Sequence, residues 1–239
     1  LALALAWAIG DVTELWLWSV QIGVWGLLLP VFLSVSHRMI PFFSSTALQP
    51  YTPWRPTWWL YTLVGCSMLR IVAIGIELNT LTIDAVMTGV LLYSTWRWDL
   101  RKSFKVKLLG MLHAAFAWAG VAMLLFAISE ALKLAGHQGL GFAPLHALTL
   151  GFFCCMLLAF VTRVTLGHSG RPLIAGGLAW TCYWTMHGVA LGRVVGELFP
   201  AIQAFSYTAA SLLGLIALMA WSRVYLPMYW QARVDGNAG

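Results

Sequence analysis

The sequence of 239 residues is 61% hydrophobic and only 9% charged, with a mean hydropathy of +0.82. A soluble domain carries roughly a quarter charged residues, so this composition excludes a soluble globular protein and indicates an integral membrane protein. The net charge of +6 does not indicate nucleic-acid binding, because the lysines and arginines lie between apolar segments and form no basic stripe. We therefore expect an all-α polytopic helical bundle that has membrane lipid, and no nucleic acid, as a partner.

The chain begins with "LALALAWAIG", which is apolar but too short to cross a bilayer. No methionine and no charged segment precede it, so it lacks the anatomy of a signal peptide. We expect these residues to be the end of a truncated helix, and further N-terminal helices of the same protein to be missing from this chain.

Seven later segments have the length and apolar character of a membrane-spanning helix, which needs about 20 residues. They cover about 15–35, 57–78, 80–97, 107–134, 145–165, 172–194 and 200–226. Prolines 41, 50, 53 and 56 are expected to break the first connection, Pro172 to start a helix after the turn "HSGRP", and Pro200 to open the last helix. The whole chain, 1–239, is thus predicted to form one transmembrane domain that ends in a polar tail at 227–239.

The positive charges are divided unequally between the two ends of these spans. Eleven lysines and arginines fall on one side, two fall on the other, and Arg70 lies inside a span. The side rich in positive charge is predicted to be cytoplasmic. The C-terminus then lies in the cytoplasm as well.

Six histidines are spread over both halves of the predicted membrane domain. His37, His113 and His168 belong to the cytoplasmic half, and His137, His146 and His187 to the outer half. Imidazole is the commonest metal ligand in proteins and is neutral near pH 7. No two histidines are four residues apart on one helix, so any metal site must combine several helices. His137, in "AGHQGLG", is expected to be a solvated loop residue.

The two histidines predicted to lie deepest, His113 and His187, each have two interpretations. Either residue is a metal ligand, or it is a neutral side chain hydrogen-bonded to a neighbouring helix. Gly188 and Gly192 follow His187 and permit close approach of a flat group. That group is either a porphyrin or, as is more common for small residues at this spacing, another helix.

Four acidic residues and Arg70 carry the other charges that bear on function. Arg70 is predicted to form a structural ion pair with Asp84 or Glu77 across a helical hairpin. The alternative is that Arg70 binds a haem propionate or another anion. Glu130 and Glu197 are either interfacial residues or carriers of protons to a buried redox site.

Three stretches of the sequence together resemble the NnrS family: "HRMIPFF" at 37–43, "LHALTLG" at 145–151 and "RVTLGHSGRP" at 163–172. The resemblance implies a bacterial inner-membrane protein of about twelve spans that contains haem and copper. It also implies a link to nitric oxide metabolism and nitrosative stress. This chain would then be the C-terminal portion of such a protein.

The resemblance also implies candidate cofactor ligands. His37 and Arg38 match the first motif, His146 the second, and Arg163, Gly167, His168, Gly170 and Arg171 the third. We expect copper at His37, His113 and His168, and non-covalent haem b at His146 and His187. The opposite assignment stays open, because Arg38, Arg163 and Arg171 would suit haem propionates on the cytoplasmic side.

Three functional hypotheses follow. The first is a haem- and copper-containing membrane protein that protects against nitric oxide or its products, whether or not it is an enzyme. The second is a non-enzymatic haem-based sensor, or a transporter or metal-handling protein, although no inverted repeat or broken helix pair is evident. The third is a structural subunit without a cofactor.

Overall fold

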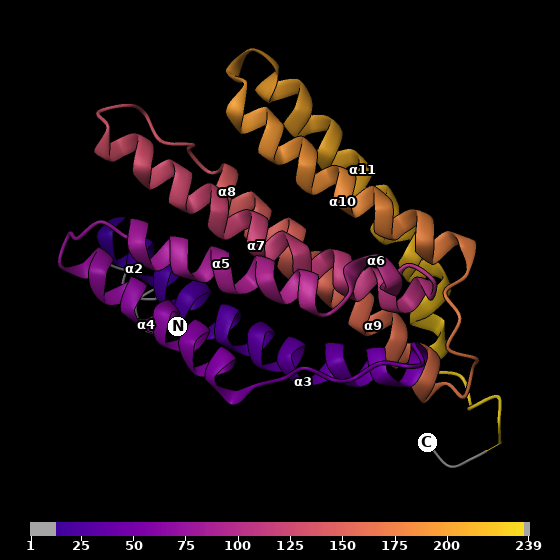
Figure 1. The fold of residues 1–239 in the computed structure, drawn as a ribbon. Helices are drawn as coiled ribbons and strands as arrows, with labels where there is room; N and C mark the ends of the chain where they lie inside the picture. The colour runs from indigo at the N-terminus through magenta and orange to yellow at the C-terminus, as the bar shows by residue number, and fades with distance from the viewer. Residues whose placement is uncertain (1–12, 237–239) are drawn as a thin grey trace.

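A computed structural model describes residues 13–236 of the chain, and every regular element within that range is a helix (Figure 1). The predicted all-α class is therefore confirmed for this part of the protein. The truncated helix expected at the beginning of the sequence lies outside the described residues.

The first membrane segment is one long rod. It consists of α2 (Thr13–Gln21), a π-helix η1 (Ile22–Leu28) and α3 (Leu29–Ala47). The prediction that Pro41 breaks this region was wrong, because Pro41 is buried inside α3. A proline removes one backbone donor, and a helix packed among other membrane helices tolerates that loss.

The next helices follow the predicted segments closely. They are α4 (Thr57–Gly75), α5 (Leu81–Arg97), a single turn α6 (Leu100–Ser103) and α7 (Lys107–Leu134). A β-carbon added to Gly120 of α7 would meet Leu92 of α5 at 2.6 Å, so the two helices approach each other closely there. The long helix α7 also packs against α9, α3 and the π-helix η2, which places it at the centre of the bundle.

The second half of the chain contains another long rod and a hairpin. The rod joins α8 (Ala143–His146), the π-helix η2 (Ala147–Cys154) and α9 (Cys155–His168). The hairpin pairs α10 (Gly177–Leu198) with α11 (Gln203–Tyr225), joined by the short turn η3 (Pro200–Ile202). Figure 1 shows these two helices side by side in orange and yellow.

Two details near the motif "RVTLGHSGRP" differ from the prediction. Helix α10 begins at Gly177 rather than at Pro172, because the residues between them form an irregular stretch. His168 is the last residue of α9 rather than part of the turn.

The polar tail begins with the turn η4 (Leu226–Tyr229) and folds back onto the end of α9. The amide of Val234 donates to the Ser169 carbonyl at 3.1 Å, and the hydroxyls of Thr165 and Tyr229 are 2.7 Å apart. The described part of the tail is therefore anchored to the α9–α10 connection.

Within residues 13–236, five helical rods are long and apolar enough to cross a membrane: Leu15–Ala47, Thr57–Gly75, Lys107–Leu134, Ala143–His168 and Pro200–Tyr229. The other two predicted spans are also helical, as α5 and α10, but they do not reach this standard. Helix α5 has only 17 residues, and α10 carries several Trp, Tyr and Thr residues and a histidine. Helices suited to crossing a membrane are thus established for five of the seven predicted segments.

Candidate functional site

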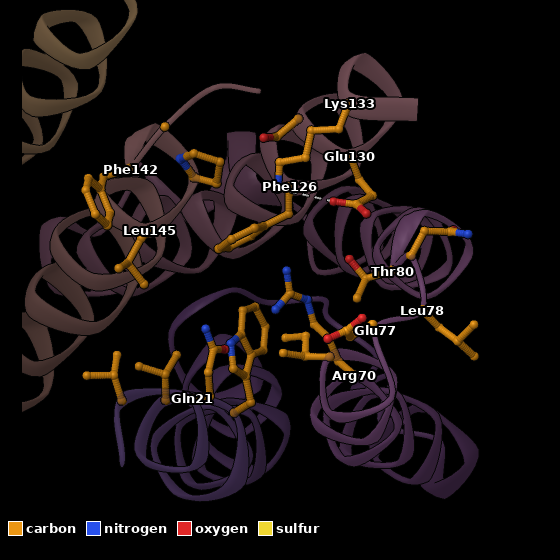
Figure 2. Close-up of a pocket in the computed structure, with 18 of the residues that line it drawn as sticks. Gln21, Arg70, Glu77, Leu78, Thr80, Phe126, Glu130, Lys133, Phe142 and Leu145 are labelled. Carbon is orange, nitrogen blue, oxygen red and sulfur yellow. Dashed lines mark hydrogen bonds and ion pairs between the residues drawn. The ribbon is translucent and has the colours of Figure 1, made fainter. Parts of the chain in front are cut away.

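A cavity of about 720 Å³ opens at the end of the bundle predicted to face outward. Its walls come from α2 and η1, α4, α7 and α8 (Figure 2). A volume of this size lies within the range of small-molecule and cofactor pockets. No histidine lines the cavity, so the histidines predicted to bind cofactors do not face it.

Arg70 is the central charged group of the cavity. Figure 2 shows its side chain between the surrounding helices, and the guanidinium carbon lies 3.9 Å from the ring centroid of Trp25 and 4.5 Å from that of Phe126. These distances correspond to cation–π contacts on two aromatic rings.

A buried ion pair fixes Arg70 from the side of α5. The Arg70 Nε donates to Asp84 Oδ1 at 2.7 Å, and the two side chains are only 8% and 0% exposed. Thr80 donates to the other carboxylate oxygen of Asp84 at 2.8 Å. The predicted structural ion pair is therefore confirmed with Asp84 as the partner, whereas Glu77 is exposed and lies at the rim of the cavity.

The π-helix η1 contributes to the wall of the cavity. Trp25 belongs to it, and its carbonyl accepts a hydrogen bond from Ser67 of α4 at 2.5 Å. Short π-helical segments occur frequently at functional sites, because they change the direction of side chains within a helix. Here the segment places Trp25 over Arg70.

A chain of hydrogen bonds links α8 and the residue before it to the α10–α11 hairpin. His146 Nε2 is 2.9 Å from the Tyr207 hydroxyl, and Tyr207 donates to Glu197 Oε2. Glu197 also accepts from Gln203 Nε2 and from the amide of Phe142, both at 3.0 Å. Three donors stabilise the ionised carboxylate of Glu197.

The direction of these bonds determines the tautomer of His146. Tyr207 has a single hydroxyl proton, and that proton goes to Glu197. His146 must then donate from Nε2, so that the lone pair of a neutral imidazole is on Nδ1. Histidines that bind metals commonly donate their other N–H in this way to an oxygen that holds the ring.

His187 has the opposite arrangement. It is 7% exposed on α10, and its Nδ1 accepts a hydrogen bond of 2.7 Å from the indole Nε1 of Trp118 on α7. An indole N–H is only a donor, so the lone pair of His187 Nδ1 accepts the hydrogen bond from Trp118. A neutral His187 ring therefore carries its proton on Nε2. That Nε2 is buried and has no hydrogen-bond partner among the described residues.

The three histidines predicted to be cytoplasmic lie in three separate environments. His37 Nε2 is 3.0 Å from the Pro56 carbonyl, and the ring stacks on Trp59 with 5.1 Å between centroids. His113 is 2% exposed and its Nε2 is 2.9 Å from Ser44 Oγ, in agreement with the hydrogen-bonded alternative. His168 is exposed at the end of α9.

These three histidines do not assemble into a copper site in the described structure. Ser44, the partner of His113, lies seven residues after His37 on α3, which corresponds to about 10 Å along the helix axis. Among residues 13–236, no group of three His, Cys, Asp or Glu side chains is arranged to hold a metal ion. The residues present therefore do not fit the predicted three-imidazole copper site.

Two of the three arginines of the motifs contact other side chains, and the third is exposed to solvent. The Arg163 guanidinium lies 3.9 Å from the ring centroid of Phe43. Arg171 donates to Gln231 of the tail at 3.0 Å, and Arg38 is exposed. Arg163 thus connects α9 with α3, and Arg171 helps to hold the tail.

Comparison with protein families agrees with the motifs. A family model described as NnrS protein matches residues 1–233. The chain belongs to the NnrS family. No curated protein and no solved structure matches it.

Two residues of this family member that determine the state of its histidines were not predicted from the sequence. Trp118 and Tyr207 are 69 and 61 residues away from the histidines they contact. Neither belongs to a motif, and aromatic residues are frequent throughout the chain, so no local signal identifies them. Glu197 was singled out, but not as the end of a chain that starts at His146.

Proposed function

We propose that this protein is a haem-containing inner-membrane protein that acts in the bacterial response to nitric oxide and in protection against nitrosative stress. Membership of the NnrS family supports the membrane location and the link to nitric oxide. The observation that carries the haem assignment is the hydrogen-bond chain from His146 through Tyr207 to Glu197.

In this proposal His146 is the residue that holds haem b, through Nδ1. Tyr207 keeps the proton of His146 on Nε2 and fixes the plane of the ring, and Glu197 fixes Tyr207. Haem, when bound, supplies an iron centre for redox chemistry on a nitrogen oxide. His187 is not part of the ligand set, because its Nδ1 already accepts from Trp118.

Copper binding remains an expectation from the family resemblance. His37, His113 and His168 do not fit a shared copper site in this structure, so we derive no step that involves copper. The inner-membrane orientation with a cytoplasmic C-terminus, the count of seven spans and the single domain with a polar tail are likewise proposed. They are supported by the charge asymmetry, by the helices found in each of the seven predicted segments within the described residues, and by the tail anchored on α9.

The first test is an optical spectrum of the detergent-purified protein, oxidised and reduced, together with metal analysis. We expect a Soret band in the parent protein and in the His137→Ala control, which changes an exposed loop residue. His146→Ala should lack the band. A parent protein without haem, or a His146→Ala variant with normal haem content, would refute the assignment.

One observation favours a second candidate function, a transporter or sensor that does not turn over a substrate. The cavity at the outer end contains a buried Arg70–Asp84 pair, and buried charges in membrane helices often lie on substrate or ion pathways. Movement of a ligand across reconstituted membranes without any redox change, abolished by Arg70→Met, would favour this candidate over the first.

A further inference from the structure

The contact between Trp118 and His187 joins the two long helices α7 and α10 in the interior of the bundle. The indole Nε1 and the imidazole Nδ1 are 2.7 Å apart. The ring of Tyr183 meets that of His187 edge to face at 4.3 Å, and the ring of Trp184 lies 5.2 Å away. His187 is thus surrounded by three aromatic side chains and is 7% exposed.

The donor-only chemistry of the indole removes one of the two roles considered for His187. A neutral imidazole has one N–H and one lone pair. Because Trp118 takes the lone pair on Nδ1, the second nitrogen is an N–H donor and has no lone pair for a metal. A ligand role would require His187 to lose this hydrogen bond, which leaves the Trp118 N–H without its acceptor.

The same chemistry leaves a buried donor without an acceptor. Buried polar groups in folded proteins are almost always hydrogen-bonded, and the exceptions often indicate a bound water or ligand. His187 Nε2 has no protein acceptor within the described residues. The neighbouring Tyr183 hydroxyl is committed as the donor to the Met111 carbonyl of α7.

We propose that His187 is a hydrogen-bond donor rather than a metal ligand, that Trp118 is its positioning residue, and that Nε2–H binds one small oxygen acceptor, of which water is the simplest. The aromatic rings around His187 restrict the acceptor to a small molecule. This inference rests on the proposed function in one respect, namely that haem is held at His146 and not at His187. The position of the proton on His187 follows from its hydrogen bond with Trp118 and does not depend on a cofactor.

The competing explanation is an N–H···π contact. The edge-to-face arrangement with Tyr183 is compatible with an N–H directed at a ring face, which is a weak hydrogen bond. Such a contact would satisfy Nε2 without any bound molecule. The two explanations differ in whether the Nε2 proton is in contact with water.

The test is nitrogen-15 NMR of the histidine-labelled protein in lipid bilayers, with the His187 signals assigned by their loss in His187→Gln. We expect an unprotonated Nδ1 and a protonated Nε2, and we expect the Nε2–H signal to build up from water in a water-edited spectrum. In Trp118→Phe the Nδ1 signal should shift strongly. Trp184→Phe, which removes an adjacent ring but no hydrogen bond to His187, should leave it unchanged.

Each other outcome overturns a defined part of the proposal. A protonated Nδ1, or an Nε2 that loses its proton on loading with haem or copper(II), would restore the ligand role. An Nε2–H signal that receives nothing from water would establish the contact with the Tyr183 ring instead of a bound acceptor. None of these results depends on His146, so failure of the haem assignment there is detected separately by the optical spectrum of His146→Ala.

Discussion

His146 and His187 belong to the same predicted half of the membrane domain and to helices that pack together, yet their imidazoles have opposite chemistry. His146 donates through Nε2 toward Tyr207 and keeps the Nδ1 lone pair. His187 accepts through Nδ1 and keeps an unpaired N–H. The comparison shows that depth and residue type do not define a ligand, because the partner of the other ring nitrogen decides which atom is available.

Replacing the two histidines should give the largest contrast. We expect His146→Ala to lose its bound haem and His187→Ala to retain it, since only His146 has a free lone pair on a ring held in place. Haem per protein, measured from the Soret absorbance of purified material, checks this. Equal losses in both variants would contradict the distinction between the two residues.

The carboxylate behind His146 should have the next largest effect. Glu197→Gln removes the charge that receives the Tyr207 proton, and loss of a residue that holds a ligand histidine in place typically changes affinity by about 10–100-fold. Haem titration of the apoprotein measures the change. Glu77→Gln, which alters an exposed carboxylate at the rim of the cavity, is the matched control and should bind haem like the parent.

Adding a methyl group against the Trp118 ring should disturb the packing around His187 and leave His146 unaffected. A β-carbon on Gly151 would lie 2.5 Å from the Trp118 ring, whereas one on Gly188 would meet nothing within 4 Å. We expect Gly151→Ala to lower the free energy of unfolding by up to about 3 kcal/mol, as overpacking does. Gly188→Ala, next to His187 in the chain, should be close to neutral in the same denaturation experiment.

The smallest effect is expected from the hydrogen bond of Trp118 itself. Trp118→Phe removes one neutral hydrogen bond, which contributes about 1 kcal/mol to stability. Thermal unfolding followed by circular dichroism, with Trp184→Phe as the control, measures the difference. A Trp118→Phe variant as stable as this control would indicate that the indole does not hold His187.

Part of the fold was predictable because apolar length and proline position act locally. The segment 107–134 was predicted with the bounds that α7 has, and α5 matches 80–97 within one residue. The errors occurred where tertiary packing overrides a local rule. Pro41 continues a helix that its neighbours support, and Pro172 is followed by an irregular stretch before α10 starts.

The ion pair of Arg70 was also predictable, since an arginine and an aspartate on a short antiparallel hairpin have few other partners in a membrane. What the sequence did not indicate is that Trp25 and Phe126 cover the guanidinium, or that a cavity opens beside it. Gly192 illustrates the same limit. Its added β-carbon would lie 3.6 Å from Ala210 and Ser206 of α11, so the close approach at that glycine is that of a helix.

The sequence by itself determined the membrane class, the order and approximate ends of the helices, the family, and the residues worth testing. These properties depend on composition, on spacing along the chain and on short motifs. Only the tertiary structure decided that His37, His113 and His168 stay apart, and that His146 and His187 differ in the nitrogen that remains free. The physical reason is that a histidine's tautomer is set by hydrogen bonds to residues 61 and 69 positions away, and only packing of the helices brings those partners together.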